Sequence, residues 1–170
     1  MYLDTIQGQY ASSGRTPTQG CTNAEIQELE RQIGLAFPVA YREFLAWAGH
    51  DAGELFHPDE EYAYGDLLEL QTIAQDIVQE SGFRDPLPND MIVIQLYWGM
   101  QFAFISASEG ENPPVYEFLW VPPEMTVRFQ SPETMITKTI KSPLAKPPRL
   151  MKGVRFSQWI AEYVTGDTGE

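Results

Sequence analysis

The segment HDAGELFHPDEE, residues 50–61, holds the densest group of side chains in this chain that could bind a metal ion. His50 and His57 offer imidazole nitrogens, and the carboxylates around them offer oxygens, a donor set that suits Zn²⁺ and related ions. The seven-residue spacing does not place the two histidines on one helix face, and the chain has only these 2 histidines. A metal-dependent hydrolase that uses His50 and His57 is therefore the weakest functional hypothesis, and we expect no metal, no cofactor and no catalytic residue.

Nucleophilic chemistry has little support elsewhere in the chain. Cys21 is the single cysteine, so it cannot form an internal disulfide, and no histidine near it in the sequence could activate the thiol. A Gly-x-Ser-x-Gly elbow and a glycine-rich phosphate loop are both missing from the sequence. We therefore predict a protein that is not an enzyme. Because the sequence has neither a secretory signal nor an apolar run of about 18 residues, we expect a cytoplasmic location and no membrane contact.

Charge is distributed unevenly along the chain. The net charge is −13, from 24 acidic and 11 basic residues. Between Glu43 and Glu124 lie 16 acidic residues and one basic residue, whereas Thr126 to Arg155 holds seven basic residues and one acidic residue. Such an acidic surface repels nucleic acid and attracts a basic protein. Two alternatives stay open: the acidic loops only keep the protein soluble, or the basic segment folds back and neutralises them.

The elements that must position the acidic loop come directly before it. Residues 26–49 show the apolar spacing of two short amphipathic helices joined by a tight elbow. Thr22 and Glu25 predict a capping box for the first helix, and Gly34 predicts a left-handed stop after it. Pro38 suits the first turn of the second helix, which a glycine ends.

The rest of the chain predicts an antiparallel meander between helices. The expected elements are a short strand at 67–70, a helix from Thr72 to Gly82, strands at 91–96, 101–107 and 115–119, an edge strand at 125–129, an irregular connection over 130–154 with a helical turn at 133–140, and a last helix from Phe156 to Tyr163. This order indicates an α+β fold: a single domain with helices packed on a mainly antiparallel β-sheet. We expect a flexible lead-in at 1–21, the domain at 22–165 and a tail at 166–170.

The chain also resembles a known superfamily. The segment LERQIGLAFPVAYREFLAWAG is similar to the opening signature of the SUKH superfamily, which includes fungal cell-wall regulators of the Smi and Knr type and bacterial toxin-immunity proteins. The later segments MIVIQLYWGMQFAFISA, SEGENPP, VYEFLW and FSQWIAEYV follow in the same order, so the resemblance covers roughly Thr22 to Val164. It implies a SUKH-like α+β domain that binds other proteins.

The resemblance implies two possible functions, and neither of them is the hydrolase considered above. The first is an immunity protein that neutralises a cognate toxin by covering its active site; many such toxins act on nucleic acids, as nucleases or deaminases, and are basic. The alternative is a regulatory scaffold like the fungal relatives, although the flanks here are short. Exposed tyrosine and tryptophan favour interfaces, so we predict that a hairpin tip joins the acidic loops in the contact surface. The predicted partner-binding residues are Asp51, Glu54, Asp59, Glu60, Glu61, Tyr97, Trp98, Glu109 and Glu111.

Overall fold

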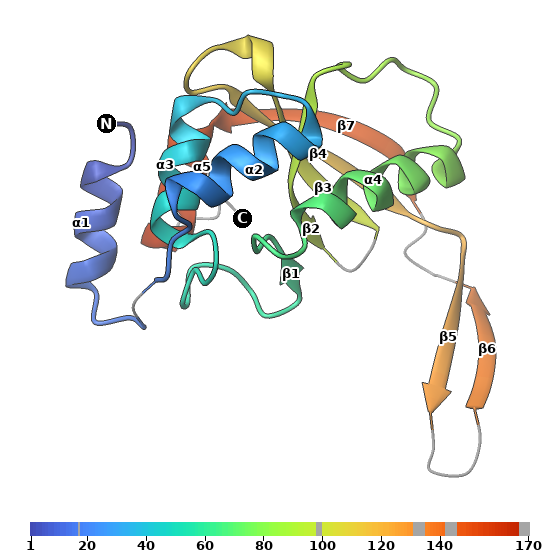
Figure 1. Cartoon of the computed structure of the whole chain (residues 1–170). Coiled ribbons are helices and arrows are strands. Elements are labelled where there is room, and N and C mark those ends of the chain that lie inside the picture. Colours follow the sequence, from blue (N-terminus) through green and yellow to red (C-terminus); the bar gives the residue numbers. More distant parts are fainter. Residues whose placement is uncertain (17, 98–99, 131–134, 142–145, 167–170) are drawn as a thin grey trace.

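A five-stranded antiparallel sheet forms the centre of the structure, a computed structural model that describes residues 1–16, 18–97, 100–130, 135–141 and 146–166 (Figure 1). The strand order is β1-β2-β3-β4-β7. The strands are β1 (Glu60–Glu61), β2 (Met91–Tyr97), β3 (Gln101–Ser106), β4 (Pro114–Val121) and β7 (Lys146–Arg155). A separate two-stranded sheet, β5 (Glu124–Gln130) with β6 (Met135–Lys141), projects from the body (Figure 1).

Helices lie against this sheet and against one another. They are α1 (Asp4–Ser12), α2 (Asn23–Ile33), α3 (Val39–Ala48), α4 (Leu67–Ser81) and α5 (Phe156–Thr165), and a 3₁₀ turn, η1 (Ala107–Glu109), follows β3. α4 packs along β2, whereas α5 packs against α3, β4 and β7. The predicted single-domain α+β class is confirmed. Among the described residues, no helix is both long enough and apolar enough to cross a bilayer.

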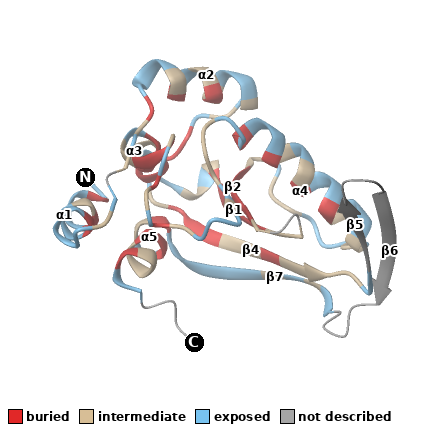
Figure 2. Cartoon of the chain, turned by 90° about the horizontal axis from the view of Figure 1, so that it is seen from below, coloured by how far each residue is buried: buried red, intermediate tan, exposed pale blue. Residues whose placement is uncertain are grey.

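The two helices of the elbow, α2 and α3, have the ends that the sequence predicts. The Thr22 hydroxyl accepts the backbone N–H of Glu25, and the Glu25 carboxylate accepts the backbone N–H of Thr22, so the capping box is present. Gly34 ends α2 in the left-handed region, with φ of 79°. Pro38 directly precedes α3 instead of lying in its first turn. The buried faces of these helices point into the core (Figure 2).

The predicted strand at 67–70 is wrong, because these residues form the first turn of α4. Leu67, Leu70 and Ala74 are buried at helical spacing, which continues the face of the following turns. A four-residue stretch such as Leu-Leu-Glu-Leu is too short to show a period, so the sequence could not separate a strand from a helix start. The predicted stop at Gly82 is confirmed by its left-handed conformation.

The predicted irregular connection over 130–154, with its helical turn at 133–140, is also wrong in the described parts. β6 and β7 occupy most of it, and β5 pairs with β6 instead of extending the meander. β7 pairs antiparallel with β4 and is an edge strand. Pro147 and Pro148 are tolerated there because an edge strand does not need every N–H for pairing.

The N-terminal residues differ from the predicted flexible lead-in, because Asp4–Ser12 form helix α1. Leu3, Ile6 and Tyr10 are buried and form one apolar stripe, which was too short to stand out in a polar segment. The Tyr10 hydroxyl donates to the carbonyl of Ala52 at 3.2 Å, so α1 is tied to the acidic loop. The domain boundaries at 21/22 and 165/166 stay predictions.

Candidate functional site

The end of the acidic loop joins the central sheet as strand β1. In the antiparallel pair of β1 and β2, Glu60 lies opposite Tyr97 and Glu61 lies opposite Leu96. The structure therefore brings Glu60, Glu61 and Tyr97 together, three of the residues predicted for the partner surface. Trp98 lies outside the described residues.

A cavity of about 140 Å³ lies beside this pair, on one face of the sheet. Strand register places alternate residues of β2, β3 and β4 on this face, and α5 and β1 complete the wall. The lining residues are Glu60, Gln95, Tyr97, Gln101, Phe102, Ala103, Glu117, Leu119 and Tyr163. On the other face, Phe102 and Phe118 stack with ring centroids 5.0 Å apart, and Phe83, just after α4, packs on Phe118. The hollow, here called the open-face cavity, therefore lies on the side away from α4.

A bulge in β2 directs Gln95 into the open-face cavity. The register of β2 against β3 shifts between Val93 and Gln95, so that Gln95 instead of Ile94 pairs with Ala103. The Gln71 side chain of α4 holds the bulge, since it donates to the Val93 carbonyl and accepts the Val93 N–H, each at 2.8 Å. A polar side chain in an otherwise apolar strand is thereby turned toward the cavity.

The carboxylate of Glu60 is partly desolvated in this wall. Its Oε2 accepts the backbone N–H of His57 at 2.7 Å, and its Oε1 lies 3.5 Å from the Tyr163 hydroxyl, which donates to it. Gln95 Nε2 donates to the same hydroxyl at 3.5 Å. Burial raises the pKa of Glu60 above its usual value, although the His57 N–H acts in the opposite direction. Burial, followed by the charge of Glu60, raises the pKa of Tyr163, so its phenol stays a hydrogen-bond donor.

Glu117 brings a second carboxylate to the same face. It pairs with Ala103 across β3 and β4 and lines the open-face cavity. The described lining contains no lysine or arginine, and neither Glu60 nor Glu117 takes part in an ion pair with a described lysine or arginine. Lys146 and Arg149 line a separate hollow next to it. Two acidic groups of this kind suit an ammonium or guanidinium group from another molecule.

The other predicted acids of the loop have local structural contacts. Asp51 Oδ1 accepts the Gly53 N–H at 2.8 Å, and Glu54 Oε1 accepts the Thr16 hydroxyl at 2.6 Å. The hydrogen bonds from the Thr16 hydroxyl and the Thr16 backbone N–H lower the pKa of Glu54. Asp59 lies 3.3 Å from the His57 ring. All three acids are exposed, and none of them lines the cavity.

Glu109 and Glu111 lie at the opposite end of the sheet from Tyr97. β3 starts opposite Tyr97 and ends opposite Met91, and both glutamates follow its far end. Glu109 Oε1 accepts the Tyr116 hydroxyl at 2.9 Å and pairs with Lys152 at 3.6 Å, and Glu111 accepts the Tyr2 hydroxyl. The structure therefore does not bring them into one surface with Glu60. Lys152 of the basic segment therefore reaches Glu109, whereas no described ion pair joins this segment to the acidic loop at 50–61, so the alternative that it neutralises the acidic loops stays a prediction.

Sequence comparison gives the relationship of this fold to known proteins. The model of the SMI1 / KNR4 family (SUKH-1) matches residues 20–138. The chain belongs to the SUKH-1 family. No curated protein and no solved structure gives a significant match. Family membership confirms the SUKH resemblance, and SUKH proteins are generally non-catalytic proteins that act through contacts with other proteins.

Seven of the nine cavity residues of this SUKH-1 domain were missed by the sequence prediction, and three of them show why. Gln95 gave a usable signal, because it is the one polar side chain in the run MIVIQLY. Glu117 alternates with apolar residues in VYEFLW, which is typical of an exposed position. Tyr163 is the last residue of the final helix that the sequence predicts, and its hydroxyl donates to Glu60.

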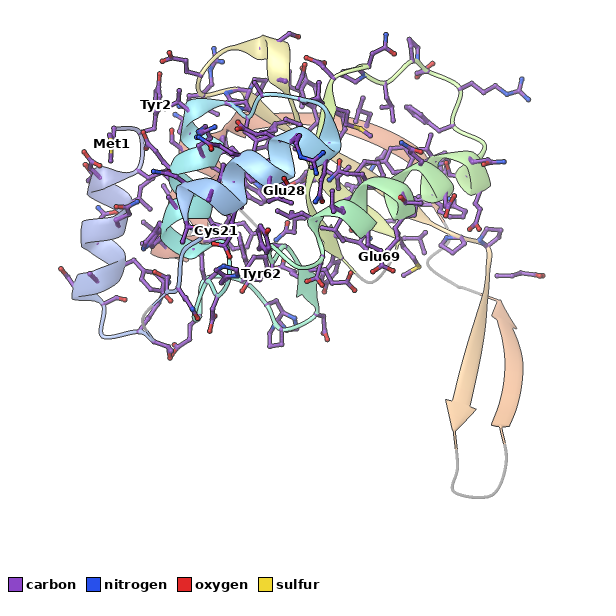
Figure 3. All side chains as sticks on the ribbon, in the orientation of Figure 1. Met1, Tyr2, Cys21, Glu28, Tyr62 and Glu69 are labelled. Atoms are coloured by element: carbon purple, nitrogen blue, oxygen red, sulfur yellow. The ribbon has the colours of Figure 1, made fainter. Side chains whose placement is uncertain are left out.

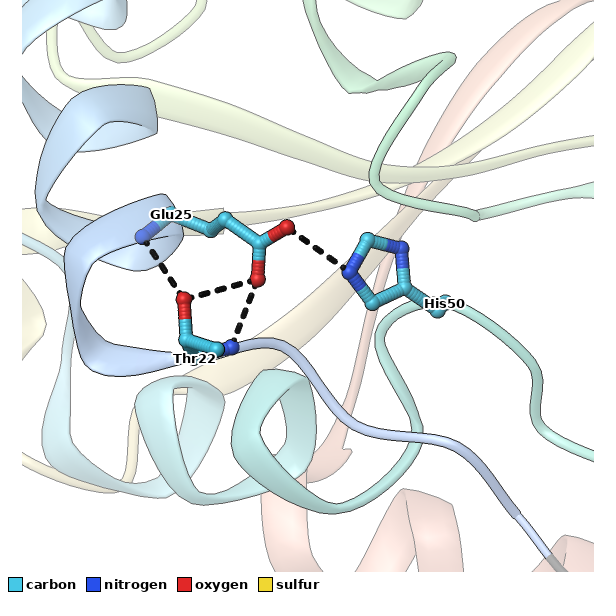
Figure 4. Close-up of polar contacts among 3 residues, drawn as sticks. All are labelled: Thr22, Glu25 and His50. Carbon is cyan, nitrogen blue, oxygen red and sulfur yellow. Dashed lines mark hydrogen bonds and ion pairs between the residues drawn. The ribbon is translucent and has the colours of Figure 1, made fainter.

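The two histidines of the SUKH-1 domain do not share a contact group. His50 Nε2 lies 3.1 Å from Glu25 Oε1 (Figure 4), whereas His57 pairs with Asp59. Cys21 is buried against the core, not in a mobile segment, and its sulfur lies within 4.8 Å of the Glu25 and His50 donor atoms. Burial and the charge of Glu25 raise the pKa of the Cys21 thiol to about 11, the opposite of an activated nucleophile.

Proposed function

We propose that this SUKH-1 domain is an immunity protein that binds a cognate basic toxin domain and covers its active site. The observation that carries the proposal is the open-face cavity, where the carboxylates of Glu60 and Glu117 have no described lysine or arginine between them. A toxin that acts on nucleic acid, such as a nuclease or a deaminase, presents lysine and arginine side chains in its substrate groove. One such side chain would enter the cavity, and the chain around it would block the groove.

The residues of the cavity suit a cationic side chain. Gln95 and Gln101 supply amide oxygens, and the two carboxylates supply charge in a wall that already excludes part of the water. Charge pairs formed in such surroundings contribute more than pairs at an open surface. Asp59 and Glu61 are exposed beside the cavity and add to the field that attracts a basic partner before contact.

Protection against a toxin is the direct test. The probe is the toxin module encoded in the reading frame next to the gene for this chain, expressed with and without the full-length protein. We expect the wild-type chain to restore growth and a chain with both Glu60→Gln and Glu117→Gln to protect poorly. A Glu80→Gln chain is the matched control, because Glu80 is an exposed residue of α4 on the other side of the sheet. A regulatory scaffold would bind without protecting, and that result would overturn the proposal.

The salt dependence of association tests the electrostatic part separately. If the acidic surface steers a basic partner, the association rate falls as ionic strength rises from roughly 50 to 500 mM, because the Debye length shortens. Stopped-flow fluorescence of the purified pair measures that rate. A rate that does not change over this range would mean that the acidic surface is not the contact surface.

A further inference from the structure

Three side chains of types that bind metal ions come from separate segments and lie close together at the N-terminus of α2. Cys21 precedes the helix, Glu25 lies in its first turn, and His50 follows α3; the Cys21 label in Figure 3 marks the place. The thiol sulfur, one carboxylate oxygen and one imidazole nitrogen all lie within 4.8 Å of one another. None of these groups belongs to the open-face cavity.

The position of the Cys21 sulfur is fixed by close backbone contacts. Cys21 N–H donates to the Leu45 carbonyl of α3 at 2.8 Å. A side chain at Gly20 would place its Cβ 1.8 Å from the Ala46 carbonyl oxygen, and a Cβ at Gly49 would lie 2.5 Å from the Cys21 sulfur. Both glycines are therefore needed for the thiol to sit where it does.

Hydrogen bonds and ring packing also fix the positions of Glu25 and His50. Glu25 uses Oε2 for the capping box, accepting the Thr22 N–H at 2.7 Å and the Thr22 hydroxyl at 2.8 Å, and this leaves Oε1 directed at His50 (Figure 4). The backbone N–H of His50 donates to the Gln19 carbonyl at 2.9 Å, and the imidazole ring packs on Tyr64 with centroids 5.1 Å apart. Contacts of this kind orient metal ligands in known sites.

We propose that Cys21, Glu25 and His50 bind a divalent metal ion, with Zn²⁺ as the ion that the donors suit best. Thiolate, imidazole and carboxylate are the usual ligands of zinc, whereas calcium and magnesium take oxygen ligands. Tetrahedral zinc holds its ligands about 3.5 Å apart, so donor atoms that lie within 4.8 Å of one another need to approach by no more than about 1.3 Å. Cys21 is buried while Glu25 and His50 are half-buried, which leaves one side for a water molecule as fourth ligand.

Binding exchanges one set of bonds for another. The Cys21 thiol loses its proton to solvent, the Nε2 proton of His50 moves by way of solvent to Nδ1, and the hydrogen bond between His50 and Glu25 is replaced by one bond from each residue to the metal. The ion would join the segment before α2, the first turn of α2 and the start of the acidic loop after α3. This site is independent of partner binding through Glu60 and Glu117.

The test uses the full-length chain without a histidine tag, stripped with a chelator and titrated with Zn²⁺ and with Co²⁺. We expect one zinc ion per chain by calorimetry and a thiolate-to-cobalt charge-transfer band in the near ultraviolet. Cys21→Ser, Glu25→Gln and His50→Ala should each weaken binding by at least about tenfold. His57→Ala is the matched control and should bind as the wild type does, because His57 contacts Asp59 outside this group.

Each other result overturns the proposal. Zinc binding that is equal in Cys21→Ser and wild type, or lost in His57→Ala, would place the ion on the surface carboxylates or the loop. A cobalt complex without the charge-transfer band would exclude the thiolate as a ligand. Circular dichroism of each variant confirms that it is folded, and Glu25→Gln, which keeps an oxygen for the Thr22 cap, serves if Cys21→Ser does not fold.

Discussion

Carboxylates at the two ends of the sheet differ in what their own chain provides for them. At the turn after β3, Glu109 has Tyr116 and Lys152, and Glu111 has Tyr2. In the open-face cavity, Glu60 has a backbone N–H and a distant phenol, and Glu117 has no described ion-pair partner. The number of acidic residues in a segment therefore does not show which carboxylates the chain itself pairs: Glu109 has Lys152 although its Oε2 is buried without a described hydrogen-bond partner, whereas Glu60 and Glu117 have no described lysine or arginine.

The register of the basic edge strand β7 produces this difference. Lys152 lies opposite Tyr116, with its ammonium group 5.3 Å from the ring centroid, and so reaches Glu109. Met151 lies opposite Glu117 and carries no charge. Because neighbouring strand residues point to opposite faces of a sheet, the side chain of Lys152 points away from the cavity face. A shift of β7 by one residue would reverse which acid is neutralised.

The largest expected effect is on partner affinity. Glu60→Gln and Glu117→Gln should each weaken binding of the cognate toxin module by about 2 kcal/mol, or roughly thirtyfold, because each leaves a cationic side chain poorly compensated. Glu111→Gln, at the opposite end, should change the Kd less than twofold. Calorimetry on the purified pairs measures all three. Equal losses of affinity in the three variants would show that only total charge matters, and would contradict a difference between the two ends of the sheet.

The next effect is on the free energy of unfolding, compared between a tyrosine that contacts the acidic loop and one that contacts Glu111. The Tyr10 hydroxyl accepts the Glu54 N–H at 2.8 Å, and its proton is shared between the carbonyls of Thr16 and Ala52, so Tyr10→Phe should lower the free energy of unfolding by about 2 kcal/mol. Tyr2 is exposed, and among the described residues its hydroxyl bonds to Glu111 alone, so Tyr2→Phe should cost less than about 0.5 kcal/mol. Urea unfolding of both variants gives the comparison. Similar losses would contradict a preformed acidic loop.

Local signals in the sequence explain which parts of this picture could be predicted. Capping by Thr22 and the stop at Gly34 depend on a few adjacent residues, so α2 was predicted with its ends. The pairing of β7 with β4 depends on residues about thirty positions apart, and local composition rich in proline and lysine favoured a loop instead. Nothing in the local pattern shows that partner.

The open-face cavity could be predicted only in part, for a similar reason. The acidic loop and Tyr97 were found from residue type alone. Gln95 faces the cavity because of the bulge that Gln71 of α4 holds, a contact between two elements that the sequence pattern does not connect. Glu109 was included because of its charge, and its neutralisation by Lys152 follows from strand register.

A smaller effect distinguishes the same acids in the free protein. Glu109→Gln should lower the free energy of unfolding by about 1 kcal/mol, because it weakens the contacts with the Tyr116 hydroxyl and Lys152. Glu60→Gln should leave stability unchanged or raise it, since it removes a charge that burial disfavours. Thermal unfolding at neutral pH measures both. A loss of stability in Glu60→Gln would mean that Glu60 serves the fold and not a partner.

The smallest effect is the pH dependence of stability, and it has opposite signs at the two ends. Asp90, at the same end as Glu109, accepts the Ser106 hydroxyl at 2.7 Å and the Ser108 N–H at 2.6 Å, and these hydrogen bonds lower its pKa. A lowered pKa adds stability above the unfolded value of about 4, which is lost as pH falls through the folded value. The raised pKa of Glu60 adds stability at low pH that is lost as pH rises through the folded value.

Two variants separate these contributions in chemical unfolding between about pH 3 and pH 7. The stability deficit of Asp90→Asn relative to wild type should be largest at pH 7 and should shrink as pH falls below about 4. The free energy of unfolding of Glu60→Gln relative to wild type should increase as pH rises above about 4, because only the wild type must ionise a partly buried acid. If the free energy of unfolding of both variants falls relative to wild type as pH rises, the charge of Glu60 is stabilised by its own chain. The cavity would then be no different from the Glu109 end.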